Sequence, residues 1–223
     1  MKVLALETAN EHCSVALVDN ETELFFKLDT QAKAQTKTIL PMIANALEQE
    51  NLTYNDLTAI AFSRGPGSFS GVRINAAVTQ ALAWANDLVV VPVSTLQAVA
   101  QAAFHTLGMD QVSVVMDARM QEVYLANFSL NNGVMQLDGN ECLLNYSDAQ
   151  TKASYTLVGS GCALLDQTLK HSKQEQITAS AKEIATLAVY YIKQKQWVSA
   201  DQALPVYLRD DAWKKISEQG KRD

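Results

Sequence analysis

The stretch Ser63-Arg64-Gly65-Pro66-Gly67-Ser68-Phe69-Ser70-Gly71-Val72-Arg73 decides how the rest of the chain is arranged. It follows an apolar run at residues 57–62, typical of a buried strand, and precedes an alanine-rich run at residues 74–85, typical of a helix. Its three glycines permit a turn with little steric hindrance, and Ser68 or Ser70 can cap the helix that follows. The stretch therefore predicts a strand, a tight turn and a helix N-terminus.

The same arrangement can bind an anion, because free N–H groups and the helix dipole point out of such a turn. However, the spacing meets neither Gly-x-x-x-x-Gly-Lys-Ser/Thr nor Gly-x-Gly-x-x-Gly, the two nucleotide fingerprints. Two interpretations of the loop from Gly65 to Gly71 stay open at this point. One is a contact with phosphate, and the other is a tight structural connection.

The composition is that of an ordinary globular protein. The 223 residues are 48% hydrophobic and 19% charged, which allows one large domain or two small ones. A formal net charge of -6 disfavours binding to nucleic acid without a basic partner. Cys13, Cys142 and Cys162 are odd in number and far apart, so free thiols are favoured over a disulfide or a zinc site. Neither a signal-peptide pattern nor a membrane-spanning run is found, and we expect a cytoplasmic protein.

The first part of the chain predicts a meander followed by alternating helices and strands. Short apolar runs joined by turn residues predict three antiparallel strands, at residues 3–8, 13–18 and 24–28. A helix is predicted at residues 39–47. Pro41 requires that this helix begin near Thr38, because only the first turn of a helix has no N–H bond to lose.

The chain then continues through the opening stretch to a strand at residues 88–92 and a helix that Ser94 caps and that ends near Leu107. Alternation of strands and helices requires parallel pairing through right-handed crossovers. After residue 108 the same order begins again. Strands are predicted at residues 111–116, 122–129, 134–137 and 155–158, and helices at residues 162–170 and 181–194.

This repeat is topological, without matching residues, and it predicts two α/β halves at residues 1–108 and 109–200. We expect the tail, residues 201–223, to pack back on the first half. Glu7 ends the first strand of the first half, and Asp117 holds the matching place in the second. Across a cleft between the halves, these carboxylates could hold Mg²⁺ and a nucleotide; alternatively, each could accept hydrogen bonds from its own turn.

Other catalytic chemistry has less support. His12, His105 and His171 are isolated, without a His-x-x-x-His pair, so no metal site is expected. Ser68 and Ser70 have no nearby base and do not form a Gly-x-Ser-x-Gly elbow. We therefore assign no catalytic residue, no metal ligand and no cofactor.

The predicted helix at residues 72–85 is apolar around nearly its whole circumference, so it must be covered on more than one side. The helix at residues 39–47 could supply that cover within the subunit. The favoured interpretation is that both helices together form a surface for a partner protein.

Five ordered blocks resemble the bacterial TsaB (YeaZ) family over essentially the whole chain. They are Lys2-Val-Leu-Ala-Leu-Glu-Thr-Ala with Cys13-Ser-Val-Ala-Leu, Arg64-Gly-Pro-Gly-Ser-Phe-Ser-Gly-Val-Arg-Ile, Val93-Ser-Thr-Leu, Met116-Asp-Ala-Arg-Met-Gln-Glu-Val-Tyr, and Pro205-Val-Tyr-Leu-Arg. The resemblance implies an α/β fold of the actin/Hsp70/sugar-kinase type, with two ribonuclease-H-like halves. It also implies a role without catalysis of its own. In that role the subunit works with the related TsaD subunit and the ATPase TsaE to make N6-threonylcarbamoyladenosine at position 37 of tRNA.

The resemblance further implies where partners bind. The first two helices contact TsaD, or a second copy of the subunit when TsaD is absent, and tRNA is reached only through the complex. The implied interface residues are Ile39, Leu40, Ile43, Leu47, Ile74, Ala77, Val78 and Ala81. The family signature loop comprises Arg64, Gly65, Pro66, Gly67, Ser68, Phe69, Gly71 and Arg73.

One departure bears on chemistry. TsaD carries a His-x-x-x-His motif, whereas the comparable stretch here, from Lys33 to Pro41, contains no histidine, and Gln35 stands where many TsaB sequences have one. A peptidase activity is therefore not expected. The rival hypothesis is a small actin-like ATPase or kinase that uses Glu7, Asp117 and the Gly65 to Gly71 loop.

Overall fold

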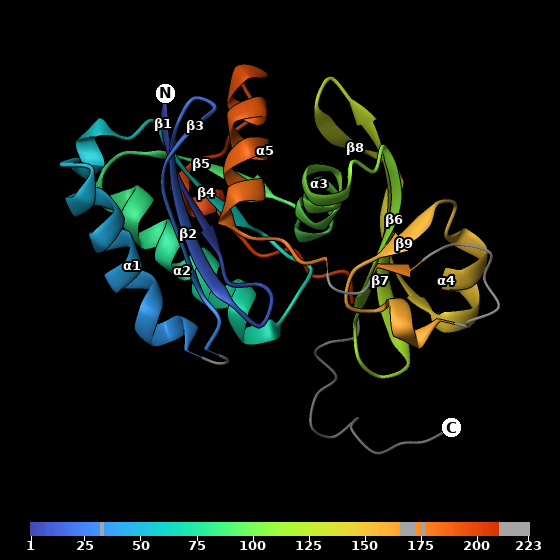
Figure 1. Cartoon of the computed structure of the whole chain (residues 1–223). Coiled ribbons are helices and arrows are strands. Elements are labelled where there is room, and N and C mark those ends of the chain that lie inside the picture. The colour runs from blue at the N-terminus through green and yellow to red at the C-terminus, as the bar shows by residue number, and fades with distance from the viewer. Residues whose placement is uncertain (32–33, 166–172, 175–176, 210–223) are drawn as a thin grey trace, which may run out of the picture.

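Over residues 1–31, 34–165, 173–174 and 177–209, which the computed structural model describes, the chain forms two five-stranded mixed sheets (Figure 1). The first sheet contains β1 (Lys2–Glu7), β2 (Cys13–Asp19), β3 (Thr22–Asp29), β4 (Ala59–Ser63) and β5 (Val89–Val93). The second contains β6 (Gln111–Asp117), β7 (Glu122–Asn131), β8 (Val134–Asn145), β9 (Thr156–Val158) and β10 (Lys173–Gln174).

Both sheets have the same strand order. The first runs β3-β2-β1-β4-β5 and the second runs β8-β7-β6-β9-β10. In each sheet the first three strands pair antiparallel, as their short turns predict, and the other two join in parallel. The repeat confirms the predicted fold class, an actin/Hsp70/sugar-kinase arrangement of two ribonuclease-H-like halves.

Two helices cover the outer face of the first sheet, α1 (Gln35–Gln49) and α2 (Phe69–Ala85). Their apolar sides join the sheet in one buried cluster, which includes Ile43 of α1 and Ala76 of α2. Ser68 caps α2, since its hydroxyl accepts a hydrogen bond from the Gly71 N–H at 3.4 Å. The strand, turn and helix predicted around the opening stretch are therefore confirmed.

The predicted start of α1 is wrong. The helix begins at Gln35, so Pro41 lies inside it, beyond the first turn, and not at its start near Thr38. Proline removes one N–H bond to the carbonyl four residues earlier, which here belongs to Lys37. Both Lys37 and Pro41 are exposed, so water can solvate that carbonyl and the helix continues through the proline.

Two more helices lie between the sheets, α3 (Thr95–Leu107) and α5 (Ala181–Lys193) (Figure 1). α3 follows the first sheet in the chain but packs on β6 to β9, while α5 follows the second sheet but packs on β1, β2, β4 and β5. One buried cluster runs through both helices and both sheets. The division at residue 108 therefore separates the two sheets, whereas each of these helices packs on the sheet of the other segment.

The second half differs from prediction in several places, one of which is the unpredicted two-residue strand β10. β8 continues to Asn145, well past the predicted end at Leu137, and leads into a short helix that was not predicted, α4 (Tyr146–Lys152). Asn145 caps α4 by accepting the Asp148 N–H at 2.9 Å. The helix predicted at residues 162–170 is wrong in its described part: Cys162–Leu164 form only a 3-10 turn, η2, and Leu165 is extended. Residues 166–170 lie outside the described part. Two further 3-10 turns are η1 (Tyr54–Asp56) and η3 (Ala200–Gln202).

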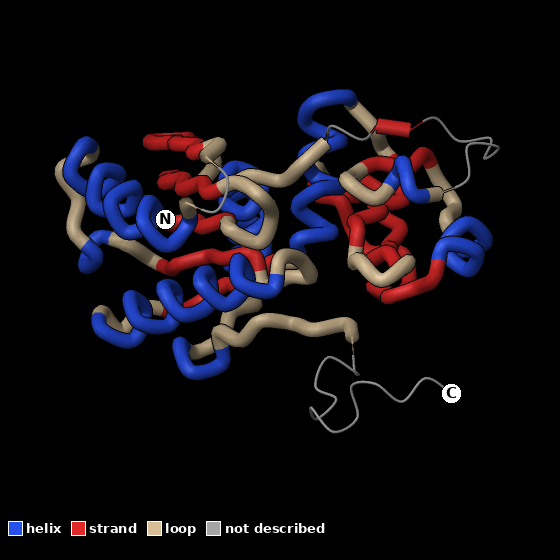
Figure 2. The backbone as a smooth tube through the Cα atoms, turned by 90° about the horizontal axis from the view of Figure 1, so that it is seen from below, coloured by secondary structure: helices blue, strands red, loops and turns tan. Residues whose placement is uncertain are grey.

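The described part of the tail lies along both halves. η3 packs on α2, and the Val206 N–H donates to the Arg64 carbonyl of the first half at 2.8 Å. The chain then runs toward the second half (Figure 2). There the Arg209 guanidinium donates to the Ala118 carbonyl at 3.1 Å. Residues 210–223 of the predicted tail lie outside the described part. No helix among the described residues is long and apolar enough to cross a membrane.

Candidate functional site

A cleft of about 690 Å³ lies between the two halves. The turn after β1, the glycine-rich loop and the start of α3 line it from one side. The turn after β6 lines it from the other, and the tail, which contacts both halves, completes the lining. The residues that meet there include Asn10, His12, Pro66, Gly67, Ser68, Thr95, Asp117, Arg119, Ser160, Val206 and Arg209. This is the place where the two predicted carboxylates were expected to face one another.

Glu7 is not among the residues that line this cleft. Its side chain is only 1% exposed, and its Oε1 accepts the N–H groups of Ala9 at 2.5 Å and Asn10 at 3.3 Å. Its Oε2 has no hydrogen-bond partner among the described residues. Burial raises the pKa of Glu7 to about 7. The carboxyl group therefore closes the turn that follows its own strand.

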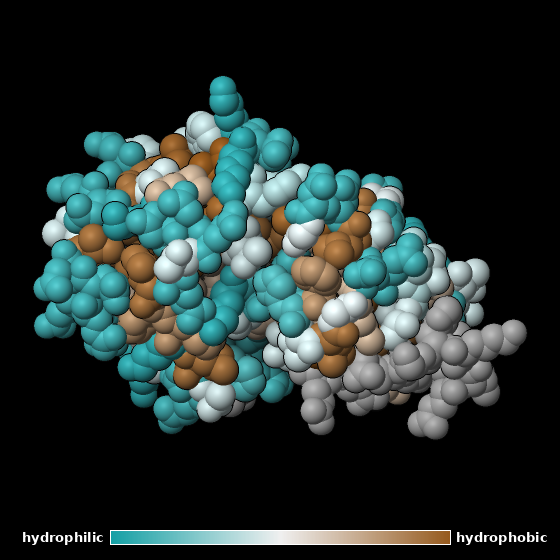
Figure 3. Space-filling model, turned by 45° about the horizontal axis from the view of Figure 1, so that its top comes forward, coloured by the Kyte–Doolittle hydropathy of each residue, from teal (hydrophilic) through white to brown (hydrophobic). Residues whose placement is uncertain are grey.

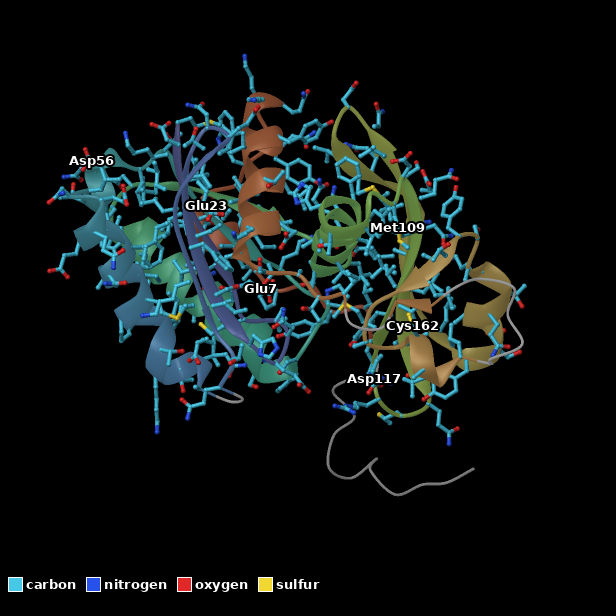
Figure 4. The ribbon with its side chains drawn as sticks, in the orientation of Figure 1. Glu7, Glu23, Asp56, Met109, Asp117 and Cys162 are labelled. Carbon is cyan, nitrogen blue, oxygen red and sulfur yellow. The ribbon has the colours of Figure 1, made fainter. Side chains whose placement is uncertain are left out.

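Asp117 does line the cleft, but its oxygens are also engaged locally. Oδ1 accepts the Arg119 N–H at 2.7 Å, and Oδ2 lies 2.8 Å from the Arg119 guanidinium. Figure 4 places Glu7 and Asp117 in different halves. Among the described residues, no group of three or more His, Cys, Asp or Glu side chains could hold a metal ion. Each carboxylate thus has the alternative geometry that the sequence left open, in which an acid at a strand end accepts hydrogen bonds from its own turn.

The glycine-rich loop packs directly on the turn after β1. A Cβ atom on Gly71 would lie 2.0 Å from the Thr8 carbonyl oxygen, and one on Gly67 would lie 2.4 Å from the Ala9 carbonyl oxygen. The Ser68 N–H donates to the Ala9 carbonyl at 2.7 Å, and the Thr8 hydroxyl donates to the Gly71 carbonyl at 2.8 Å. This geometry favours the structural interpretation of the loop, because these glycines are needed for close approach of backbone to backbone.

The remaining signature residues connect the loop to distant segments. The Arg64 guanidinium lies 3.3 Å from the Glu141 carboxylate on β8, in the other half. The Gly65 carbonyl accepts the N–H of Thr95, the first residue of α3, at 3.0 Å. These contacts join the start of the loop to β8, a strand of the second sheet, and to α3, which packs on that sheet. Glu141 was not predicted as part of the site, and no motif around it signals the role.

An aromatic and cationic cluster lies at the edge of the cleft. The Arg73 guanidinium is 3.5 Å from the centre of the Phe69 ring, and its Nε donates to the Tyr207 hydroxyl at 2.9 Å. The cluster joins the start of α2 to the tail. Tyr207 was not predicted as a site residue, although it lies in the block Pro205-Val-Tyr-Leu-Arg that carries part of the family resemblance.

The predicted partner surface on α1 and α2 divides into core and exposed residues. Ile39, Ile43 and Leu47 are 1%, 0% and 6% exposed and pack in the core, so their side chains cannot meet a partner in this conformation. This part of the predicted residue set needs correction: the helical period placed these residues on an apolar face, and that face is turned to the sheet.

The exposed remainder is Leu40, which is 52% exposed, with Ala77 and Ala81; Ile74 and Val78 are partly buried. Trp84, which was not predicted, is 71% exposed at the end of α2. Trp84 follows Ala81 by three residues, which puts both on the same side of a helix, so this spacing could have identified Trp84 from the sequence. On the face drawn in Figure 3, apolar residues also reach the surface, but hydrophilic side chains interrupt them. The presence of exposed apolar residues alone therefore does not identify a partner surface; their arrangement along one helix has to be considered as well.

Known proteins resemble this chain over almost its full length. The family model of TsaD, tRNA N6-adenosine threonylcarbamoyltransferase, matches residues 29–214. The tRNA threonylcarbamoyladenosine biosynthesis protein TsaB of Escherichia coli strain K12 is 34% identical, over 97% of this chain and 98% of its own. The protein of the same name from Haemophilus influenzae is 36% identical, over 97% of each chain.

A solved structure, YeaZ from Pseudomonas aeruginosa, matches with a TM-score of 0.85 and 33% identity. It covers 93% of this chain and 99% of its own. A tRNA N6-adenosine threonylcarbamoyltransferase of Limosilactobacillus reuteri strain DSM 20016 is 32% identical, but over only 41% of this chain and 31% of its own. The likeness to TsaB proteins is therefore full-length, whereas the likeness to this transferase is partial.

Proposed function

We propose, since the chain belongs to the TsaB family of tRNA threonylcarbamoyladenosine biosynthesis proteins, that it is a non-catalytic subunit that binds and positions a TsaD-type transferase. The ATPase TsaE joins the same assembly. On its own, the subunit pairs with a second copy through the same surface. With a net charge of -6, it meets tRNA only through the complex.

The observation that carries this proposal is the exposed apolar stripe on α2. Ala77 and Ala81 lie one turn apart and Trp84 follows, all exposed, while Ala76 and Ala83 on the opposite side are buried against the sheet. Leu40 of the neighbouring α1 is exposed as well. Small residues along a helix allow a second helix to approach closely, and an exposed tryptophan is a typical anchor residue of interfaces.

The local engagement of Glu7 and Asp117 supports a role without chemistry. Glu7 is buried with a raised pKa, and Asp117 is paired with Arg119, so neither presents a free carboxylate to the cleft. The cleft volume of about 690 Å³ is nevertheless within the usual range for small-molecule sites, which keeps the ATPase hypothesis testable. Magnesium-dependent ATP hydrolysis by the isolated chain, lost in Glu7→Gln, would support that rival.

The deciding experiment is light scattering of this protein alone and mixed with TsaD from the same organism. We expect a homodimer that becomes a heterodimer, and we expect Ala81→Glu to weaken both assemblies. The substitution puts a charge on an exposed position, so the melting temperature should stay within a few degrees of the unmodified chain. Ser147→Glu, on exposed α4 in the second half, is the matched control and should assemble normally. A protein that is monomeric on its own and does not bind TsaD would overturn the proposal.

A further inference from the structure

A second groove, of about 430 Å³, lies where α2 ends and η3 begins. Trp84 and Leu88 line it from the end of α2 and the turn that follows, and Ser199 and Asp201 line it from η3 and the residue before it. Asp87, in the same turn after α2, also lines the groove. The groove is separate from the cleft between the halves, with which it shares no lining residue.

Three sources of negative potential meet in this groove. Asp87 and Asp201 are exposed, and neither forms an ion pair within the described part of the chain. The third source is the C-terminal end of the α2 dipole, and the last turn of α2 contains no basic residue to offset it. Trp84 adds an exposed aromatic face, which attracts cations.

Asp87 occupies a backbone position that favours another residue. The Leu88 N–H donates to the Ala83 carbonyl at 3.0 Å, which closes the helix in a Schellman motif, and Asp87 takes the left-handed position with φ 53°. Glycine is preferred there, and asparagine is the next choice. A carboxylate next to the negative end of a helix is also unfavourable. A residue that opposes two local preferences is expected where function requires it.

The groove continues the proposed partner surface. Ala77, Ala81 and Trp84 follow one another along the same side of α2, so a partner that covers the two alanines reaches the groove at its end. We propose that this groove receives a cationic side chain of the TsaD-type partner, held between the Trp84 ring and the carboxylates of Asp87 and Asp201. Arginine fits better than lysine, because a planar guanidinium can stack on the ring and pair with a carboxylate at once. This inference rests on the proposed function.

The test is titration calorimetry of the full-length chain with TsaD from the same organism, at low and at moderate salt. We expect Asp87→Asn/Asp201→Asn to raise the Kd about tenfold at low salt and to flatten its salt dependence, as loss of complementary charge does. Trp84→Ala should raise the Kd by about tenfold or more, as the loss of an aromatic anchor does. Asp110→Asn, an exposed aspartate in the second half, is the matched control and should bind as the unmodified chain does.

A thermal melt of Asp87→Asn gives a second readout. Because asparagine suits the left-handed position and removes a charge from the helix end, we expect equal or higher stability together with weaker binding. A purely structural role would instead lower stability and leave the Kd unchanged.

Two failures can be told apart in this design. If Ala81→Glu weakens binding while the double aspartate variant keeps the Kd and its salt dependence, the groove proposal is wrong and the proposed function stands. If the unmodified chain does not bind TsaD, the proposed function fails and the groove proposal fails with it.

Discussion

The guanidinium of Arg64, directly after β4, lies 3.3 Å from the carboxylate of Glu141 on β8, so this ion pair joins the end of a strand of the first sheet to a strand of the second. The Glu141 side chain is 8% exposed and that of Arg64 is 28% exposed. The carboxylate is therefore largely withdrawn from water and depends on its partner for charge compensation.

We predict that Arg64→Met lowers the free energy of unfolding by about 1–3 kcal/mol, because it leaves Glu141 nearly buried and unpaired. In the double variant Arg64→Met/Glu141→Leu, no orphaned charge remains, so the loss should be smaller than the sum of the single losses. Urea unfolding of the unmodified chain, of Arg64→Met, of Glu141→Leu and of the double variant measures this coupling. Arg119→Met breaks a pair whose guanidinium is 82% exposed, and as a control it should cost less than about 1 kcal/mol. Additive losses would contradict the coupling.

Gly71→Ala tests the close contact between the glycine-rich loop and the turn after β1. The new Cβ would lie 2.0 Å from the Thr8 carbonyl oxygen, and backbone on both sides leaves little room to shift. We expect a loss of about 3 kcal/mol, at the upper end of the range for overpacked sites. Ser70→Ala, the exposed neighbour in α2, should change stability by less than about 0.5 kcal/mol. A folded Gly71→Ala protein of unchanged melting temperature would show that the loop packs differently.

In α1, Ile43 belongs to the core, whereas Leu40 belongs to the proposed partner surface. Ile43 is fully buried, so Ile43→Ala should lower the free energy of unfolding by about 2–5 kcal/mol. Leu40 is 52% exposed, so Leu40→Ala should leave stability within about 0.5 kcal/mol. The same Leu40 variant should dissociate more readily from the second copy or from TsaD, and light scattering against protein concentration measures this. Unaltered assembly of the Leu40 variant would remove α1 from the proposed surface.

The buried carboxyl group of Glu7 should make the stability of the protein depend on pH. Burial raises its pKa from 4.5 to about 7, so between these values the folded protein holds a proton that the unfolded chain releases. Stability is therefore lost as the pH rises toward 7, and the loss is complete above it. Glu7→Gln keeps an acceptor oxygen for the Ala9 and Asn10 N–H groups but carries no charge.

The free energy of unfolding of Glu7→Gln, relative to the unmodified chain, should consequently increase by on the order of 3 kcal/mol between about pH 4 and about pH 8. Denaturant titrations at a series of pH values measure it. Glu21→Gln is the control, because Lys193 lowers the pKa of that exposed carboxyl and no such increase is expected. A constant difference across the pH range would mean that Glu7 is not held in its buried position.

Local patterns in the sequence were sufficient for most of the elements. The helix α3 illustrates this, since Ser94 caps its start and Gly108 takes the left-handed position at its end, with φ 66°. Both signals act over one turn of chain, so sequence reasoning can find them. The start of α1 was missed because solvent exposure of Lys37 and Pro41, which tolerates the proline, is a property of the packed helix.

The candidate site was only partly predictable for a similar reason. Glu7 and Asp117 could be identified as matching strand-end acids, but sequence could not decide whether they face a ligand or their own turns. Tertiary packing decides this, since burial of Glu7 and the turn at Arg119 bring N–H and guanidinium donors to the two carboxylates. Glu141 and the groove acid Asp201 lie in no motif, because Arg64, which pairs with Glu141, and Trp84, which lines the groove with Asp201, are distant in the chain.

The sequence by itself determined the antiparallel meander that opens each half, the duplication and the family, because turn chemistry, apolar runs and ordered motifs are all local properties of the chain. Only the tertiary structure decided that α3 and α5 pack on each other's halves and that Ile43 is core while Leu40 is surface. An amphipathic pattern indicates that the apolar face of a helix must be covered, but it does not identify the segment that covers it. The covering segment is set by which arrangement of the whole chain buries the most apolar surface with its polar groups satisfied.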